Sequence, residues 1–182
     1  MRAALTAALA LALIAPQSAP PAKAERFSAI LTPGPLSAKP IAIEIGVDRW
    51  STDDARASLF DVFRSGGQPS LLETLKKAKT AGYVRAPERE RLHAEYAQAE
   101  DRPDGGRRIL LLCVRYAGDW EVSHEGWTDY PFRILALTLD ASGHGTGMLF
   151  HATSVTFGRN GPDLVSERTG QSTRLLSVQK LR

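Results

Sequence analysis

Apolar residues recur at every second position over most of the chain, whereas one early block repeats at helical spacing. In IAIEIGVDR, for example, Ile41, Ile43, Ile45 and Val47 share one side of the chain. A period of two with β-branched residues is typical of a half-buried strand. On this basis we predict strands at 25–32, 41–49, 82–86, 92–100, 107–116, 132–140, 147–157, 163–168 and 172–181.

The stretch RRILLLCVRY, residues 107–116, is apolar on both of its faces. Ile109, Leu111 and Cys113 lie on one face, and Leu110, Leu112 and Val114 lie on the other. We therefore predict a central strand that is covered on both sides, with Cys113 as a buried and unreactive thiol. Because the chain has only this one cysteine, it cannot form an internal disulfide, a cysteine-based zinc site or a C-x-x-C redox motif.

Residues 51–81 are the exception to the period of two. Leu59 and Phe63 fall at helical spacing, and Ser51, followed three residues later by an aspartate, resembles a capping box. Gly66-Gly67 ends this segment, and Pro69 opens a second helical segment directly afterwards. The pattern predicts an insertion of two short helices at about 51–81.

Strands joined by turn signals surround this single helical block. The sequence therefore predicts an α+β fold, in which a mostly antiparallel β-sheet is curled or closed into a barrel of about eight strands. The two-helix insertion follows the second strand. We expect this helical pair to close one end of the barrel.

The first 24 residues are typical of a secretory signal peptide. Arg2 precedes an almost wholly apolar run, and Ala22-Lys23-Ala24 supplies the small-x-small pattern of a signal-peptidase site. We predict a signal peptide at 1–24, one domain at 25–182, and export to the periplasm or the extracellular medium. No later stretch is long and apolar enough to cross a bilayer as a helix.

Charge argues against nucleic acid as a partner. Loss of Arg2 and Lys23 with the signal peptide lowers the count of Lys and Arg from 23 to 21, against 20 acidic residues. A net charge of +1 without a basic cluster does not provide the footprint of a nucleic-acid-binding protein.

The segment LDASGHGTGMLFH, residues 139–151, invites three readings. A dinucleotide loop needs G-x-G-x-x-G before a helix, but the spacing here is G-x-G-x-G and a strand-like run follows. Asp140 begins an EF-hand-like count that ends on His151 instead of glutamate, and zinc through His144 and His151 lacks further ligands with recognisable spacing. We therefore predict a hairpin turn, with no metal and no cofactor.

An aromatic segment between two predicted strands is the candidate site. Aromatic side chains with a polar end, placed at the mouth of a barrel, can line a ligand pocket. The candidate ligand-binding residues are Tyr116, Trp120, His124, Trp127, Asp129 and Tyr130.

Three functions remain open from the residues alone. The leading hypothesis is a non-enzymatic exported domain that binds a small, partly apolar molecule or an envelope protein partner. The alternative is a hydrolase-type enzyme whose site is assembled from distant residues around His124, with Asp129 contributing. The third is a structural or interaction protein of the envelope that uses an exposed sheet edge.

Four stretches together resemble a group of exported bacterial proteins of unknown function. They are VDRWSTDDARASLFDVF, GYVRAP, RPDGGRRILL and DYPFRILALTLDASGHGTGML. The resemblance covers nearly the whole predicted domain and implies an exported, single-domain protein. It implies no activity, cofactor or catalytic residue.

Overall fold

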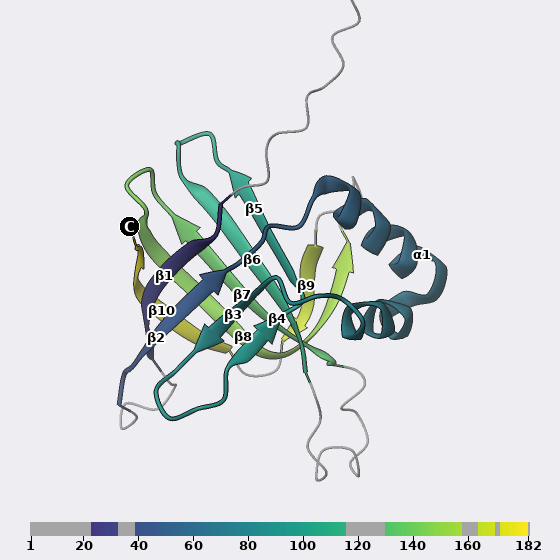
Figure 1. The fold of residues 1–182 in the computed structure, drawn as a ribbon, viewed down its shortest axis with the longest axis horizontal. Coiled ribbons are helices and arrows are strands. Elements are labelled where there is room, and N and C mark those ends of the chain that lie inside the picture. The colour runs from purple at the N-terminus through teal and green to yellow at the C-terminus, as the bar shows by residue number, and fades with distance from the viewer. Residues whose placement is uncertain (1–22, 33–38, 116–129, 158–163, 170–171, 182) are drawn as a thin grey trace, which may run out of the picture.

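The computed structural model describes residues 23–32, 39–115, 130–157, 164–169 and 172–181, which form one ten-stranded antiparallel sheet and one helix (Figure 1). Strand bounds lie within a few residues of those predicted from the period of two. The elements are β1 (Glu25–Thr32), β2 (Ile41–Val47), α1 (Asp53–Lys76), β3 (Gly82–Arg85), β4 (Leu92–Ala94), β5 (Tyr96–Asp101), β6 (Arg107–Val114), β7 (Phe132–Leu139), β8 (His144–Phe157), β9 (Leu164–Thr169) and β10 (Ser172–Lys180).

The sheet curls into a nearly closed barrel, as the sequence predicts. Its strand order is β4-β3-β2-β1-β10-β8-β7-β6-β5, with β9 paired to β8 outside this path. The two strands at the ends of the path, β4 and β5, are separated only by Glu95, whose N–H donates to the carbonyl of Leu112 on β6 at 3.0 Å. Counting β4 and β5 as one bent strand reduces the nine strands of this path to eight.

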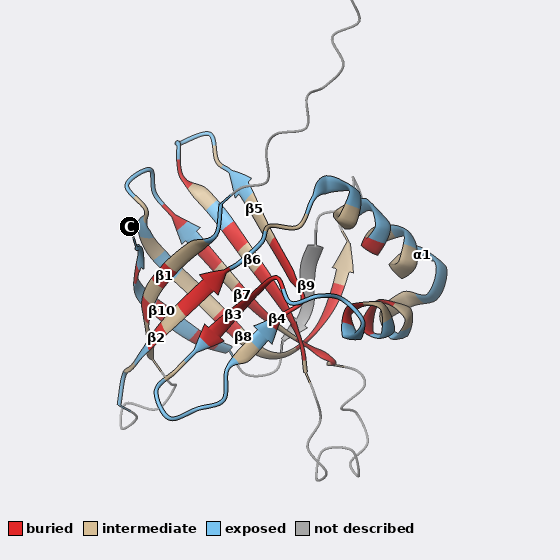
Figure 2. Ribbon diagram, viewed as in Figure 1, coloured by how far each residue is buried: buried red, intermediate tan, exposed pale blue. Residues whose placement is uncertain are grey.

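Buried positions recur along the strands of the barrel (Figure 2). The apolar side chains at these positions form the cluster that fills the barrel interior. Phe27, Ile45, Ile109, Leu111 and Leu135 are fully buried there. β6 is buried on both faces, as predicted, because Leu111 and Cys113 point inward while Leu112 and Val114 point toward the helix.

The helix covers the outer face of the barrel wall, so the expectation that it closes an end is wrong. Leu71 and Leu75 of α1 pack with Leu112, Ile134 and Val155 of β6, β7 and β8. These strand residues face outward, and their apolar side chains require cover. No helix in the described segments has the length and apolarity needed to cross a membrane.

The predicted pair of helical segments is present as one helix with a kink. Gly67, at φ 64° and ψ −157°, interrupts the helical backbone. The predicted cap at Ser51 is wrong by one residue: Thr52 caps the helix by accepting from the N–H of Ala55, at 3.2 Å. The Ser51 hydroxyl instead accepts from the N–H of Ala97 on β5, at 3.1 Å. Ser51 is therefore still bound to the barrel wall, and the helix begins after it.

The two ends of the barrel differ. At one end, which carries the β5–β6 and β7–β8 turns, Glu25 accepts hydrogen bonds from Arg107 at 2.9–3.0 Å and forms an ion pair with Lys180 at 3.0 Å. The Arg107 guanidinium also lies over the Trp50 ring, 5.3 Å from its centroid. We call Glu25, Arg107 and Lys180 the polar plug, and the opposite end, where β2, β4 and β7 begin, the mouth.

Candidate functional site

The glycine-rich segment is a hairpin turn between β7 and β8, as predicted. Asp140 Oδ1 accepts from the N–H of Ser142 at 2.8 Å, from its hydroxyl at 2.6 Å, and from the N–H of His144 at 3.1 Å. The hydrogen bond from the Ser142 hydroxyl is the main cause that lowers the pKa of Asp140. The side chain that could have bound an ion is therefore used to shape the turn.

Metal ligands are not brought together in the described segments, where no three His, Cys, Asp or Glu side chains form a group that could hold an ion. His144 and His151 lie at separate places along β8, seven residues apart, which is roughly 20 Å in an extended strand. No helix follows Gly147, because β8 runs without a break from His144 to Phe157.

A pocket of about 280 Å³, which we call the mouth pocket, lies at the mouth of the barrel. Five strands contribute apolar side chains to its lining: Leu31 from β1, Ile41 from β2, Val84 from β3, Leu92 from β4 and Leu149 from β8.

Ala86, just after β3, and four polar residues complete the described lining; the polar residues are Arg89, Glu90, Arg133 and His151. Arg133 faces inward because it lies on the same side of β7 as Leu135 and Leu137. It is also paired with the inward-facing Cys113 on β6. Two arginines against one glutamate leave the lining with a net positive charge when His151 is neutral.

His151 is held in place by a neighbouring strand. Its Nε2 lies 2.7 Å from the hydroxyl oxygen of Thr173 on β10, which is only 8 % exposed. Burial, and then the charge of Arg133, lower the pKa of His151, so the neutral imidazole is favoured. A histidine bonded to a hydroxyl is part of a catalytic triad, but no described carboxylate forms a hydrogen bond with this ring.

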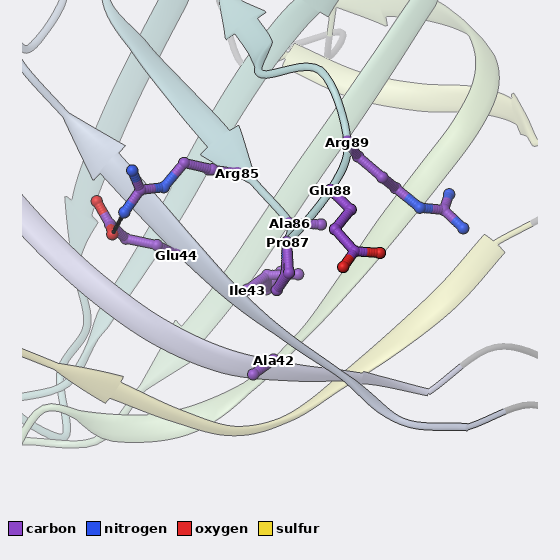
Figure 3. Close-up of a pocket in the computed structure, with 8 residues that line it drawn as sticks. All are labelled: Ala42, Ile43, Glu44, Arg85, Ala86, Pro87, Glu88 and Arg89. Carbon is purple, nitrogen blue, oxygen red and sulfur yellow. Dashed lines mark hydrogen bonds and ion pairs between the residues drawn. The ribbon is translucent and has the colours of Figure 1, made fainter.

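Two further hollows adjoin the mouth pocket. The side hollow, of about 490 Å³, shares Glu90, Leu92 and Arg133 with it. The outer groove, of about 520 Å³, lies between β2 and the turn after β3 (Figure 3). Two charged residues of its wall are paired with each other: Glu44 accepts from Arg85 at 2.5 Å. Glu44 also accepts from the Tyr83 hydroxyl, and this hydrogen bond is the main cause that lowers the pKa of Glu44.

Most of the predicted site residues lie outside the described part of the chain. They are Tyr116, Trp120, His124, Trp127 and Asp129. Tyr130 is described, is partly buried just before β7, and does not line the mouth pocket. The N–H of Arg115 donates to the carbonyl of Pro131 at 2.8 Å, so the described residues on either side of 116–129 meet at the mouth end. The hydrolase hypothesis around His124 stays a prediction.

Cys113 is fully buried below the mouth, as the sequence predicts. Burial raises the pKa of its thiol far above the ordinary value, so the thiolate needed for nucleophilic chemistry does not form near neutral pH.

Sequence reasoning missed Arg133 as a site residue, although a signal was present. In FRILALTLD, Arg133 occupies the same face as Leu135, Leu137 and Leu139, where an apolar residue is expected. A charged residue on the apolar face of a strand is either paired inside the protein or available to a ligand. His151 carries the same signal, because it shares the inward parity of Leu149 on β8.

Comparison of the chain with models of known protein families, with curated proteins and with solved structures finds no significant match. The resemblance to exported bacterial proteins of unknown function therefore stays a prediction.

Proposed function

We propose that this protein binds a small, partly apolar molecule in the mouth pocket. The observation that supports this most strongly is the contrast between the packed interior of the barrel and the hollow at its mouth. Leu111 and Leu135 fill the centre completely, whereas Leu31, Ile41 and Leu149 line open space. Concave, mainly apolar pockets with a few polar groups are the usual form of a small-molecule site.

The size of the mouth pocket limits the ligand. A volume of about 280 Å³ lies at the lower end of the range for ligand pockets. At the packing density of protein interiors, it accommodates about ten non-hydrogen atoms. A longer ligand would extend past Leu92 into the side hollow, which shares this residue.

We propose that the binding takes place outside the cytoplasm, after removal of residues 1–24. Glu25 would then be the first residue of the mature chain, and it is also the first residue of β1. Amino-terminal sequencing of the protein from its own host tests this. A chain that begins at Glu25 is expected, and a cytosolic protein that retains residues 1–24 would contradict it.

The binding proposal is tested by native mass spectrometry of protein purified from its host's envelope. Wild-type protein should carry a small molecule of discrete mass. Ala86 lines both the mouth pocket and the outer groove, so Ala86→Phe places a ring at the wall they share and should abolish the adduct. Ala42→Phe is the matched control, because Ala42 is exposed and lines only the outer groove.

Circular dichroism should show that both variants fold. The proposal fails if the wild-type protein carries no small molecule, or if Ala86→Phe retains the adduct while folded. If Ala42→Phe loses the adduct, the ligand lies in the outer groove, and this result would also contradict the proposal.

A further inference from the structure

The mouth of the barrel contains an inward-facing arginine, Arg133. Among the described residues, Arg133 forms no hydrogen bond and no ion pair, although it sits between the mouth pocket and the side hollow. Two other arginines of the barrel are matched to carboxylates, in the pairs of Arg26 with Asp48 and of Arg85 with Glu44.

The opposite end of the same barrel shows what a matched interior cation looks like. Arg107 and Lys180 occupy inward-facing strand positions there, and Glu25 lies between them at 2.9 and 3.0 Å. The Glu25 side chain is only 13 % exposed, so this carboxylate closes the end of the barrel by pairing with both cations. The mouth has the cation and the hollow, but no described carboxylate in contact with the cation.

From this contrast we infer that the ligand of the mouth pocket is a small amphipathic anion, whose acidic head is bound by Arg133 and whose apolar tail enters the barrel. The inference rests on the proposed function and specifies its ligand class. A guanidinium favours carboxylate and phosphate groups because its N–H groups match two acceptor oxygens. The anion would pair with Arg133 at the mouth, as Glu25 pairs with Arg107 and Lys180 in the polar plug.

The remaining lining fits the same ligand. Ile41, Val84 and Leu149 form the apolar wall that a short acyl or alkyl chain needs. His151 is neutral and fixed by Thr173, so it offers a hydrogen bond without a competing charge. Glu90 lines the same pocket and disfavours a second anionic group, which selects a ligand with a single acidic head.

Calorimetric titration of the full mature chain with four probes tests the inference. Octanoate has an acidic head and ten non-hydrogen atoms, whereas octanol has the same tail without the charge. Acetate has the charge without the tail, and octyl phosphate has the other acidic head. Octanoate or octyl phosphate should bind roughly tenfold to a hundredfold more tightly than octanol; acetate should bind weakly. Whichever of the two binds more tightly identifies the head.

Three variants locate the charge that is responsible. Arg133→Met should remove the preference for the acidic probes over octanol. Arg133→Lys should retain part of this preference, because a lysine keeps the positive charge but lacks the planar set of N–H donors of a guanidinium. Arg174→Met is the matched control: Arg174 is an exposed arginine on β10, and its loss should leave all affinities unchanged.

The outcomes separate this inference from the proposed function. If octanol binds wild-type protein as tightly as octanoate and octyl phosphate do, the pocket binds apolar molecules but the anion inference is wrong. If Arg133→Met retains the preference while folded, Arg133 is not the anion-binding residue. If none of the probes with an eight-carbon tail binds, the proposed function fails together with the inference.

Discussion

At the scale of single residues, Glu95 shows how one side chain closes the barrel. It is 8 % exposed and lies between β4, which pairs with β3, and β5, which pairs with β6. Its Oε2 accepts from the N–H of Val114 at 2.7 Å, which supplies an acceptor where the ladder between strands is interrupted. A main-chain group on the barrel seam is thus satisfied by a side chain.

Burial makes the charge of Glu95 unfavourable. Desolvation raises the pKa of its carboxyl above the ordinary value of 4.5, and the hydrogen bond from Val114 opposes this. A group whose pKa is raised by folding stabilises the fold fully below its unfolded-state pKa, and this contribution is lost as the pH rises through the folded-state pKa. The stabilisation is therefore greatest in acid.

Replacing Glu95 by glutamine should remove this pH dependence and keep an acceptor for Val114. The free energy of unfolding of Glu95→Gln, relative to wild type, should rise from about pH 4 to about pH 8. Urea unfolding at several pH values measures it, with the exposed Glu100→Gln on β5 as control. Parallel pH profiles for wild type and Glu95→Gln would contradict the account. Glu95→Ala should cost about 1–3 kcal/mol, because the Val114 N–H is left unpaired.

Gly145 shows why the glycine alternation exists. An added Cβ there would lie 1.9 Å from the carbonyl oxygen of Thr138 on β7, so the two strands approach more closely than a side chain allows. Gly143 has a different role, because its φ of 84° lies in the region that L-residues disfavour.

Gly145→Ala should therefore destabilise the protein by roughly 1–3 kcal/mol, since the strands must move apart. Thr146→Ala, at the exposed neighbouring position on β8, is the control and should change stability by less than about 1 kcal/mol. Denaturant unfolding of both variants measures the difference. Equal stability of the two variants would mean that the close approach has no energetic consequence.

At the scale of elements, α1 is part of the barrel's stability. Leu71 is fully buried against β6, β7 and β8, and the N–H of Val155 donates to the Gln68 side chain at 3.0 Å near the kink. Phe60 and Phe63 contact Phe157 at ring-centroid distances of 5.4 and 5.2 Å. The helix and the wall therefore share one hydrophobic cluster.

Truncating Leu71 to alanine should cost about 2–5 kcal/mol and lower the stability of the helix and the barrel in one transition. Thermal unfolding followed by far-ultraviolet circular dichroism and by tryptophan fluorescence measures it. Leu176→Ala, where the side chain is 44 % exposed, should change stability by less than about 0.5 kcal/mol. Two separate transitions, with the helix melting first, would show that α1 is only an accessory to the barrel.

The strand pattern could be predicted because each strand has one side that faces the core. Ile43 and Ile45 alternate with the exposed Ala42 and the half-buried Glu44, and a shift of register by one residue would expose the two isoleucines. The position of α1 could not be predicted in the same way. Its own pattern shows that it has an apolar face, but the surface that receives this face is formed by residues such as Leu112 and Ile134, far away in the chain.

At the scale of the whole molecule, the barrel has one end closed by its own charges and one end with a hollow. The plug of Glu25, Arg107 and Lys180 and the mouth with Arg133 and His151 occupy equivalent inward positions at opposite ends. The sequence predicted an aromatic segment as the site, and that segment lies outside the described residues. It did not reveal the mouth pocket, because the lining comes from six strands whose register only folding establishes.

The most direct test of the account is a map of backbone amide shifts by ¹H–¹⁵N nuclear magnetic resonance during titration with octanoate and, separately, with octanol. The largest changes should occur at the amides of Leu31, Ile41, Val84, Leu92 and Leu149, while those of Glu25, Arg107 and Lys180 stay constant. Changes centred on the polar plug or on α1, or no change with either probe at saturating concentration, would contradict a ligand site at the mouth of the barrel.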